Sequence, residues 1–138
     1  MRRGFQAVYS RAPESSARAR RAVIAVAGEW LTSNALDDLV LAVGEAVANA
    51  IVHGKGSSLT VSCYRDRDRV IVDVQDEGLG FALKGPLISL PAPMSQSGYG
   101  LYIMQNLADA VEILDDGRCI RIVKCVPVAF EQSHEDVV

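Results

Sequence analysis

Polar and apolar residues alternate along several short stretches of the chain. Residues 59–64 and 70–75 place an apolar side chain at every second position, which is the periodicity of a β-strand. The polar turn at 65–68 lies between these stretches, so they are predicted to pair as a hairpin. Three further strands are expected, over residues 5–9, about 110–115 and 119–126.

Three other segments are predicted to be helices. The first covers residues 13–31 and carries apolar residues at three- and four-residue spacing. Residues 32–34 break it, and Asp37–Asp38 open a second helix that ends near His53. The third covers residues 100–108. Because helices and hairpins occur in mixed order, the sequence predicts an α+β sandwich, with helices on one face of a mixed, largely antiparallel sheet.

Length and composition narrow the class of protein. The chain has 138 residues, 49% hydrophobic and 22% charged, which predicts one globular domain, taken as 1–130 before an acidic tail at 131–138. No apolar run reaches the roughly 18 residues of a membrane span, and no signal-type stretch is found near the start. The three cysteines form no CxxC pair, which favours buried, reduced thiols in a cytoplasmic protein. They are Cys63, Cys119 and Cys125.

The charges are nearly balanced but unevenly distributed. Fourteen basic and 17 acidic residues give a net charge of −3, which disfavours a protein that binds nucleic acid directly. Six basic residues lie within the first 21 positions: Arg2, Arg3, Arg11, Arg18, Arg20 and Arg21. This cluster is either a solvated helix face or a surface for an acidic protein partner.

The second predicted helix contains the first candidate for chemistry. It is apolar nearly all round, apart from Glu45 and Asn49, which share one stripe with His53 at four-residue spacing. Ala42 and Ala46 leave room beside this stripe. A buried carboxylate and amide need partners or a polar ligand, because dry and unpaired polar groups are costly. The alternative is an amphipathic helix with a thin solvated face.

Two glycine-containing segments are the other candidates. Asp76 follows the strand at 70–75 and precedes Gly78 and Gly80. Its carboxylate can accept a hydrogen bond from an exocyclic amine, and the two glycines let the backbone come close to a flat ring. The alternative is a tight turn, which uses the same residue types. The run SGYGL at 97–101 leads into a helix, where free amides suit a phosphate. The alternative there is a flexible hinge.

The order and spacing of these three groups resemble the three boxes of the Bergerat-fold ATPase superfamily. Residues 39–53 (LVLAVGEAVANAIVH) are similar to the first box, and residues 98–113 (GYGLYIMQNLADAVEI) to the last. More closely, residues 5–126 resemble the anti-sigma factor serine/threonine kinase family. The resemblance implies that the α+β sandwich is of the Bergerat type, a histidine-kinase-like ATP-binding domain.

The resemblance also implies a role for each matching residue. Asn49 would hold the magnesium ion that bridges the phosphates, and Glu45 would be the base that deprotonates the attacking hydroxyl. Asp76 would contact the adenine amine, with Gly78 and Gly80 shaping that end of the pocket. The backbone of four residues would contact the phosphates: Gly98, Tyr99, Gly100 and Leu101.

The function implied is that of an ATP-dependent protein serine kinase acting as an anti-sigma factor. It would use ATP and Mg²⁺, bind a sigma factor, and phosphorylate a small antagonist protein. Members of the family are commonly homodimers, which the apolar content allows. The alternative is an ATP-binding regulatory module with little or no kinase turnover. A free-standing ATPase is less favoured, because nothing in the sequence suggests a substrate other than a protein.

Two departures from the family pattern favour binding over fast phosphoryl transfer. Residues 95–97 (SQS) are neutral where the family often has a basic residue, and Gly117-Arg118-Cys119 replaces a Gly-Thr pair. Arg118 is a candidate to supply the missing charge. Residues 81–97 are rich in proline and glycine, so we expect a lid that is mobile without nucleotide and ordered by it.

Overall fold

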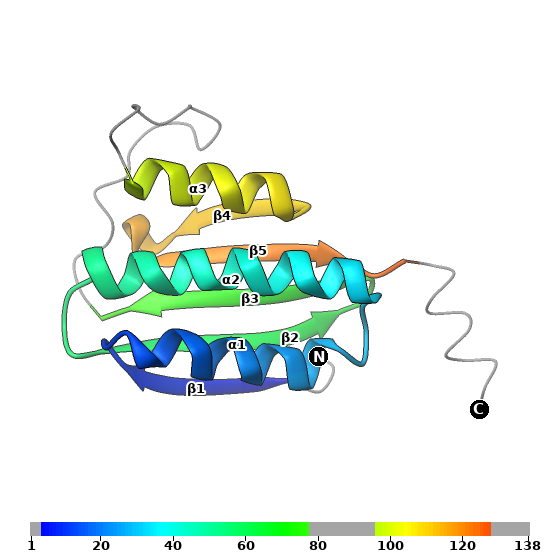
Figure 1. Cartoon of the computed structure of the whole chain (residues 1–138), viewed down its shortest axis with the longest axis horizontal. Coiled ribbons are helices and arrows are strands. Elements are labelled where there is room, and N and C mark those ends of the chain that lie inside the picture. Colours follow the sequence, from blue (N-terminus) through cyan, green and yellow to red (C-terminus); the bar gives the residue numbers. More distant parts are fainter. Residues whose placement is uncertain (1–3, 78–95, 128–138) are drawn as a thin grey trace.

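The computed structural model describes residues 4–77 and 96–127, with residues 96–99 described by their backbone. In this part of the chain three helices cover one face of a five-stranded sheet (Figure 1). The helices are α1 (Glu14–Ala27), α2 (Ser33–His53) and α3 (Gln96–Leu107). The strands are β1 (Phe5–Ser10), β2 (Ser58–Asp66), β3 (Arg69–Asp76), β4 (Ala110–Leu114) and β5 (Cys119–Cys125), with a 3₁₀ turn, η1 (Asp115–Gly117), before β5.

The strands lie in the order β1-β2-β3-β5-β4, and each of these pairings is antiparallel. The predicted α+β sandwich is therefore confirmed. The sheet, expected to be mixed and largely antiparallel, is antiparallel in all four of these pairings. The β2–β3 hairpin turns through Arg67, whose φ of 60° places it in the left-handed region. In the resulting register, Val61 lies opposite Val74, and Val74 lies opposite Ile120.

The core lies between the sheet and the helices. Because side chains alternate between the faces of a strand, the buried residues of β2 and β3 recur at every second position toward α1 and α2. Small residues along α2 let this helix lie close to the sheet and to its neighbours. The fully buried members of this set are Ala42, Val43, Ala46, Val47 and Ala50.

One boundary of each helix differs clearly from the prediction. α2 begins at Ser33 and not at Asp37, because Thr32 caps it: Thr32 Oγ1 accepts a hydrogen bond from the Ala35 amide at 3.3 Å. α3 begins at Gln96 and not at Gly100, so its two glycines lie inside the helix. α1 ends at Ala27, before the predicted residue 31.

The cysteines agree with the prediction in two of three positions. Cys63 and Cys119 are buried, and burial raises the pKa of the Cys63 thiol to about 12 and that of Cys119 to about 11. Cys125 is exposed, contrary to the prediction, because it ends β5 at the margin of the sheet. All three are free thiols.

Some predicted features fall on parts of the chain that the structure leaves undescribed. Gly78, Gly80 and residues 81–95 of the predicted lid lie outside the described residues, as does the tail at 131–138. Residues 96 and 97 of that lid belong to α3. Within the described residues, no helix combines the length and the apolar character needed to cross a membrane.

Candidate functional site

Glu45, Asn49 and Gly100 meet where α3 packs on α2. Asn49 is buried, with 8% of its surface exposed, and Glu45 is half-buried one helical turn earlier. A Cβ added at Gly100 would lie 3.3 Å from Glu45 Oε1 and 3.4 Å from both amide atoms of Asn49. The structure thus brings together two of the sequence groups that were singled out separately.

The other residues of the last predicted box lie in the first two turns of α3. Gly98 lies in the first turn, whose amides have no partner within a helix, and Tyr99 follows it. Leu101 is buried in the core together with Met104, so its side chain anchors α3 on the helical layer. This anchoring holds Gly100 against Glu45 and Asn49.

Asp76 lies at the other end of the site, beyond the C-terminus of α2. It is the last residue of β3 and shares a strand face with Val72 and Val74, so its carboxylate is directed to the helix side. Only 3% of its surface is exposed. A Cβ added at Gly54, the residue after α2, would lie 3.0 Å from Asp76 Cβ and 3.2 Å from Cγ. A side chain at position 54 would therefore push against the Asp76 carboxyl group.

Arg11 binds the end of α2 and the connection that follows it. Its Nε and Nη2 donate to the Ile51 carbonyl at 3.1 and 2.8 Å, and its Nη1 donates to the Gly56 carbonyl at 2.9 Å. A cation at a helix C-terminus interacts favourably with the helix dipole and with carbonyls that lack intrahelical partners. Arg11 was predicted only as part of the basic cluster, and the structure gives it this separate role.

Glu77 binds the same connection from the opposite strand. Its Oε1 accepts hydrogen bonds from the amides of Ser57 at 2.8 Å and Ser58 at 3.0 Å. These bonds, the one from Ser58 first, hold the pKa of the Glu77 carboxyl below its usual value. Sequence reasoning missed both Glu77 and Arg11. The available signal was the position of each residue: Arg11 directly follows β1, and Glu77 directly follows β3. The C-terminus of α2, which both residues approach, is followed by two glycines, Gly54 and Gly56.

Other members of the basic cluster have structural contacts as well. The Arg18 guanidinium lies 5.8 Å from the centre of the Tyr9 ring, a cation–π distance. Arg20 Nε donates to the Ser16 carbonyl at 3.3 Å, and its Cδ would lie 3.3 Å from a Cβ at Gly44. These contacts favour the interpretation of a helix face over that of a dedicated partner surface.

The Gly117-Arg118-Cys119 departure lies directly behind Asp76. The Asp76 amide donates to the Arg118 carbonyl at 2.9 Å, and Gly117 is buried with a φ of 88°. The Arg118 side chain is exposed and donates through Nε to the Asp115 carbonyl at 3.1 Å. Its backbone thus supports the floor of the site, while its guanidinium is held at the 3₁₀ turn.

The residues present fit a nucleotide that is bound with magnesium. A buried carboxylate at one end suits an exocyclic amine, and the amide oxygen of Asn49 is a ligand type that magnesium accepts. Gly100 leaves space beside Glu45 and Asn49 that any side chain there would fill. The chemistry of these groups and the space beside Gly100 therefore suit such a ligand.

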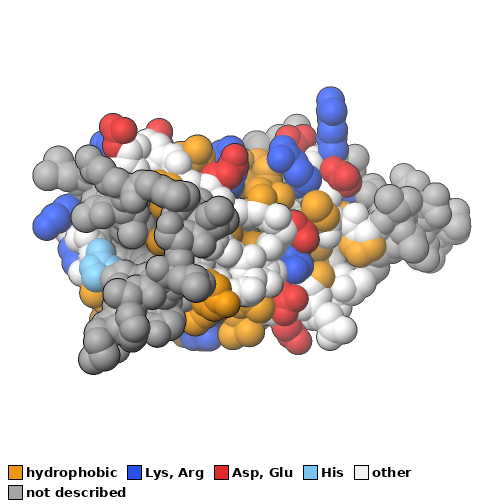
Figure 2. All heavy atoms as spheres, turned by 90° about the horizontal axis from the view of Figure 1, so that it is seen from above, with side chains coloured by type: hydrophobic (Ala, Val, Ile, Leu, Met, Phe, Trp, Pro, Cys, Tyr) orange, Lys and Arg blue, Asp and Glu red, His pale blue; other side chains and the backbone are white. Residues whose placement is uncertain are grey.

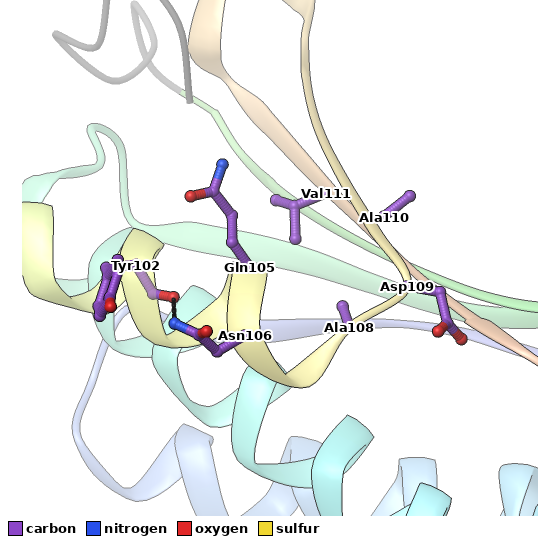
Figure 3. Close-up of a pocket in the computed structure, with 7 residues that line it drawn as sticks. All are labelled: Tyr102, Gln105, Asn106, Ala108, Asp109, Ala110 and Val111. Carbon is purple, nitrogen blue, oxygen red and sulfur yellow. Dashed lines mark hydrogen bonds between the residues drawn. The ribbon is translucent and has the colours of Figure 1, made fainter. Parts of the chain in front are cut away.

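A separate pocket of about 440 Å³ lies between the C-terminal half of α3 and the start of β4. Gln105 and Val111 point toward the same space (Figure 3), and Asn106 Nδ2 donates to the Tyr102 carbonyl at 2.9 Å. The surface seen from this side carries hydrophobic side chains between charges of both signs (Figure 2). None of Glu45, Asn49 and Asp76 lines this pocket.

Comparison with known proteins agrees with this geometry. Residues 9–124 match the histidine kinase-like ATPase domain. The chain is 32% identical over 108 residues to the anti-sigma F factor of Clostridium acetobutylicum, a match that spans 72% of this chain and 76% of the relative. It is also 32% identical over 122 residues to the anti-sigma F factor of Bacillus cereus, across 80% and 83% of the two chains. For the anti-sigma F factor of Oceanobacillus iheyensis the identity is 27% over 123 residues, across 83% and 84%.

The match to the family spans the segment that contains Glu45, Asn49, Asp76 and Gly100. It confirms the family resemblance drawn from the three sequence groups. The chain belongs to the histidine kinase-like ATPase domain family.

Proposed function

We propose that this protein binds ATP with magnesium, acts as an anti-sigma factor, and phosphorylates a serine of a small antagonist protein. The observation that carries the proposal is the meeting of Glu45, Asn49 and Gly100 at the α2–α3 contact. The names of the relatives support a sigma factor as the partner. Since transcription takes place in the cytoplasm of bacteria, the proposal places the protein there. A homodimer stays a prediction from the resemblance.

Each of the three polar residues has one task in this proposal. Asp76 accepts a hydrogen bond from the adenine amine, because its buried carboxylate is an acceptor without competition from bulk water. Asn49 holds the magnesium ion through its amide oxygen, and the bound ion would neutralise the charge of the phosphates. The amides of the first turn of α3, including that of Gly98, contact phosphate oxygens.

Glu45 acts on the attacking hydroxyl. The serine oxygen forms a bond to the γ-phosphorus as the bond from that phosphorus to the β,γ-bridging oxygen breaks, and ADP leaves. The serine proton passes to a carboxylate oxygen of Glu45, which is half-buried next to Asn49. Glu45 lies one helical turn from Asn49, so it is close to the transferred phosphoryl group without being the main ligand of the magnesium ion.

One observation favours the second candidate, an ATP-binding regulatory module with little turnover. The Arg118 guanidinium donates to the Asp115 carbonyl at the 3₁₀ turn and is exposed there. This hydrogen bond holds the guanidinium at the 3₁₀ turn, so the residue that could supply the missing charge already has a partner there. In this second candidate, nucleotide binding would control partner binding without phosphoryl transfer.

Calorimetry and a transfer assay on the same preparation test the proposal. We expect heat on adding ATP or ADP in magnesium, and transfer of labelled phosphate from ATP to a candidate antagonist protein. Inosine triphosphate, which lacks the exocyclic amine, is the matched control and should bind more weakly. Absence of heat with ATP, ADP and a non-hydrolysable analogue would overturn nucleotide binding. Binding without transfer to any antagonist would favour the regulatory module.

A further inference from the structure

We propose that Arg11 and Glu77 are positioning residues for the nucleotide base, because together they hold the α2–β2 connection against Asp76. This inference rests on the proposed function, in which Asp76 binds adenine. The connection consists of residues 54–57, between the end of α2 and the start of β2. Gly54, its first residue, forms the wall next to the Asp76 carboxyl group.

Arg11 holds this connection through its carbonyl groups. The guanidinium reaches the Ile51 carbonyl with two nitrogens and the Gly56 carbonyl with the third, and the Arg11 amide donates to the Ser57 carbonyl at 3.0 Å. The end of α2 and the turn after it are therefore tied to one rigid, planar group. A lysine has no planar fork and cannot reproduce three bonds in fixed directions.

Glu77 holds the connection through its amide groups. One carboxylate oxygen accepts from two successive amides, those of Ser57 and Ser58. Gly56 lies directly against this side chain: an added Cβ would be 2.5 Å from Glu77 Oε1 and 2.7 Å from Glu77 Cβ. Its φ of 79° also disfavours any residue with a side chain. The turn is thus shaped to bring its amides onto Glu77.

The two residues act on opposite sides of the same short turn. Arg11 binds it from the end of β1, and Glu77 binds it from the residue that directly follows Asp76. A shift of the connection would change the contact between Gly54 and the Asp76 carboxyl group. Glu45 and Asn49 lie at the contact with Gly100, on the other side of the last turn of α2. Losing either Arg11 or Glu77 should therefore affect recognition of the base more than the groups at that contact.

The experiment compares affinities for ATP and inosine triphosphate in magnesium, by calorimetry, for five variants of the whole chain. Arg11→Ala and Glu77→Ala should weaken ATP binding about three- to thirty-fold and leave inosine triphosphate binding within about two-fold. Arg11→Lys should behave like Arg11→Ala, because the charge alone does not hold the turn. Glu77→Gln should bind ATP nearly as the wild type does, because it keeps the acceptor oxygen. Arg69→Ala, at the exposed far end of β3, is the control.

The outcomes separate this inference from the proposed function. Wild-type protein that binds no nucleotide would overturn both. Wild type that binds ATP but does not prefer it over inosine triphosphate would overturn the inference and the adenine contact of Asp76, while nucleotide binding and phosphoryl transfer would still stand. Equal weakening of both nucleotides in Arg11→Ala, or full rescue by Arg11→Lys, would overturn the inference alone, since these indicate a general structural or dipole effect. If Arg11→Ala does not fold, the Arg11→Lys and Glu77→Gln pair decides the matter by the same affinity ratio.

Discussion

The two ends of the candidate site are built in different ways. At the base end, Asp76 is enclosed by backbone segments, and its neighbours are held by hydrogen bonds between elements far apart in sequence. At the phosphate end, the side chains of Glu45 and Asn49 meet a glycine where one helix crosses another. The base end is thus shaped by the fold itself, whereas the phosphate end presents side chains directly to a ligand.

Because of this difference, we expect substitutions at the two ends to have different effects. A change at the phosphate end removes a group that acts on ligand, so chemistry or metal-dependent affinity should fall while the fold persists. A change at the base end disturbs backbone that other residues position, so base selectivity should fall together with local stability. Stability, affinity and transfer rate measured on the same variants therefore test the comparison.

The largest effect is expected at Glu45. Glu45→Ala should lower phosphoryl transfer to the antagonist by about 10²–10⁴-fold, the usual contribution of a general base, and leave ATP affinity within a few-fold. Asn49→Ala should in addition lose the magnesium-dependent part of the affinity. Melting temperature, ATP affinity and labelled-phosphate transfer are measured on both variants.

A structural role of Glu45 predicts another pattern. Loss of transfer would then accompany a lower melting temperature and would follow the unfolded fraction. Full kinase activity in Glu45→Ala would contradict its assignment as the base. It would also remove the main contrast between the two ends of the site.

The next largest effect is expected at Asp76. Asp76→Asn keeps the shape and one acceptor oxygen but removes the charge. A hydrogen bond to a charged group contributes about 1.5–3 kcal/mol and one to a neutral group about 0.5–1.5 kcal/mol, so the loss is about 1–1.5 kcal/mol, or roughly 5- to 13-fold in affinity. ATP binding should weaken by that factor, while inorganic triphosphate binding changes little. Calorimetry with both ligands checks this. Equal losses for ATP and triphosphate would contradict base recognition by Asp76.

A smaller effect is expected at Gly100. In Gly100→Ala the new methyl group would lie 3.3–3.4 Å from Glu45 and Asn49 and fill the space beside them, so we expect ATP affinity to fall a few-fold. Stability should not fall, because alanine is favoured over glycine in helices by about 1 kcal/mol. Gly44→Ala is the matched control: it lies in α2, and its Cβ would meet Arg20 Cδ at 3.3 Å. Its affinity for ATP should be unchanged, and a loss equal to that of Gly100→Ala would contradict the assignment.

The sequence predicted those features that depend on local periodicity. The stripe of Glu45 and Asn49 on an apolar helix and the alternation in β2 and β3 are visible within a few turns or residues, and both are confirmed. The start of α2 was misplaced because Thr32, Ser33 and Asn34 favour both loops and helix caps. The start of α3 was misplaced because glycines disfavour helix, whereas packing of Gly100 on α2 outweighs that preference.

The base end was predicted least well because its contacts are long-range. Arg11 and Ile51 are 40 residues apart. Arg11 binds the backbone carbonyl of Ile51, and every residue type has such a carbonyl, so the sequence does not identify the partner. Glu77 binds two amides, which every residue except proline possesses. Asp76 was singled out from the sequence because its own chemistry is distinctive. The residues that position it were not, since their partners are backbone atoms.

The smallest effect is expected in the pH dependence of stability, through Glu77. Its pKa is lowered in the folded protein by hydrogen bonds from the Ser58 and Ser57 amides, so the folded state favours the charged carboxylate. Its contribution is present above its ordinary value of 4.5 and is lost as the pH falls through the lowered value. Urea midpoints between about pH 3 and 6 should therefore fall less steeply with acid in Glu77→Gln than in the wild type.

The size of this change is limited because Glu77 is exposed and solvent screens its interactions. Identical slopes in the wild type and Glu77→Gln would mean that the two amide bonds do not favour the charged carboxylate. A shallower slope in Glu77→Gln would link the acid sensitivity of the fold to the turn beside Asp76.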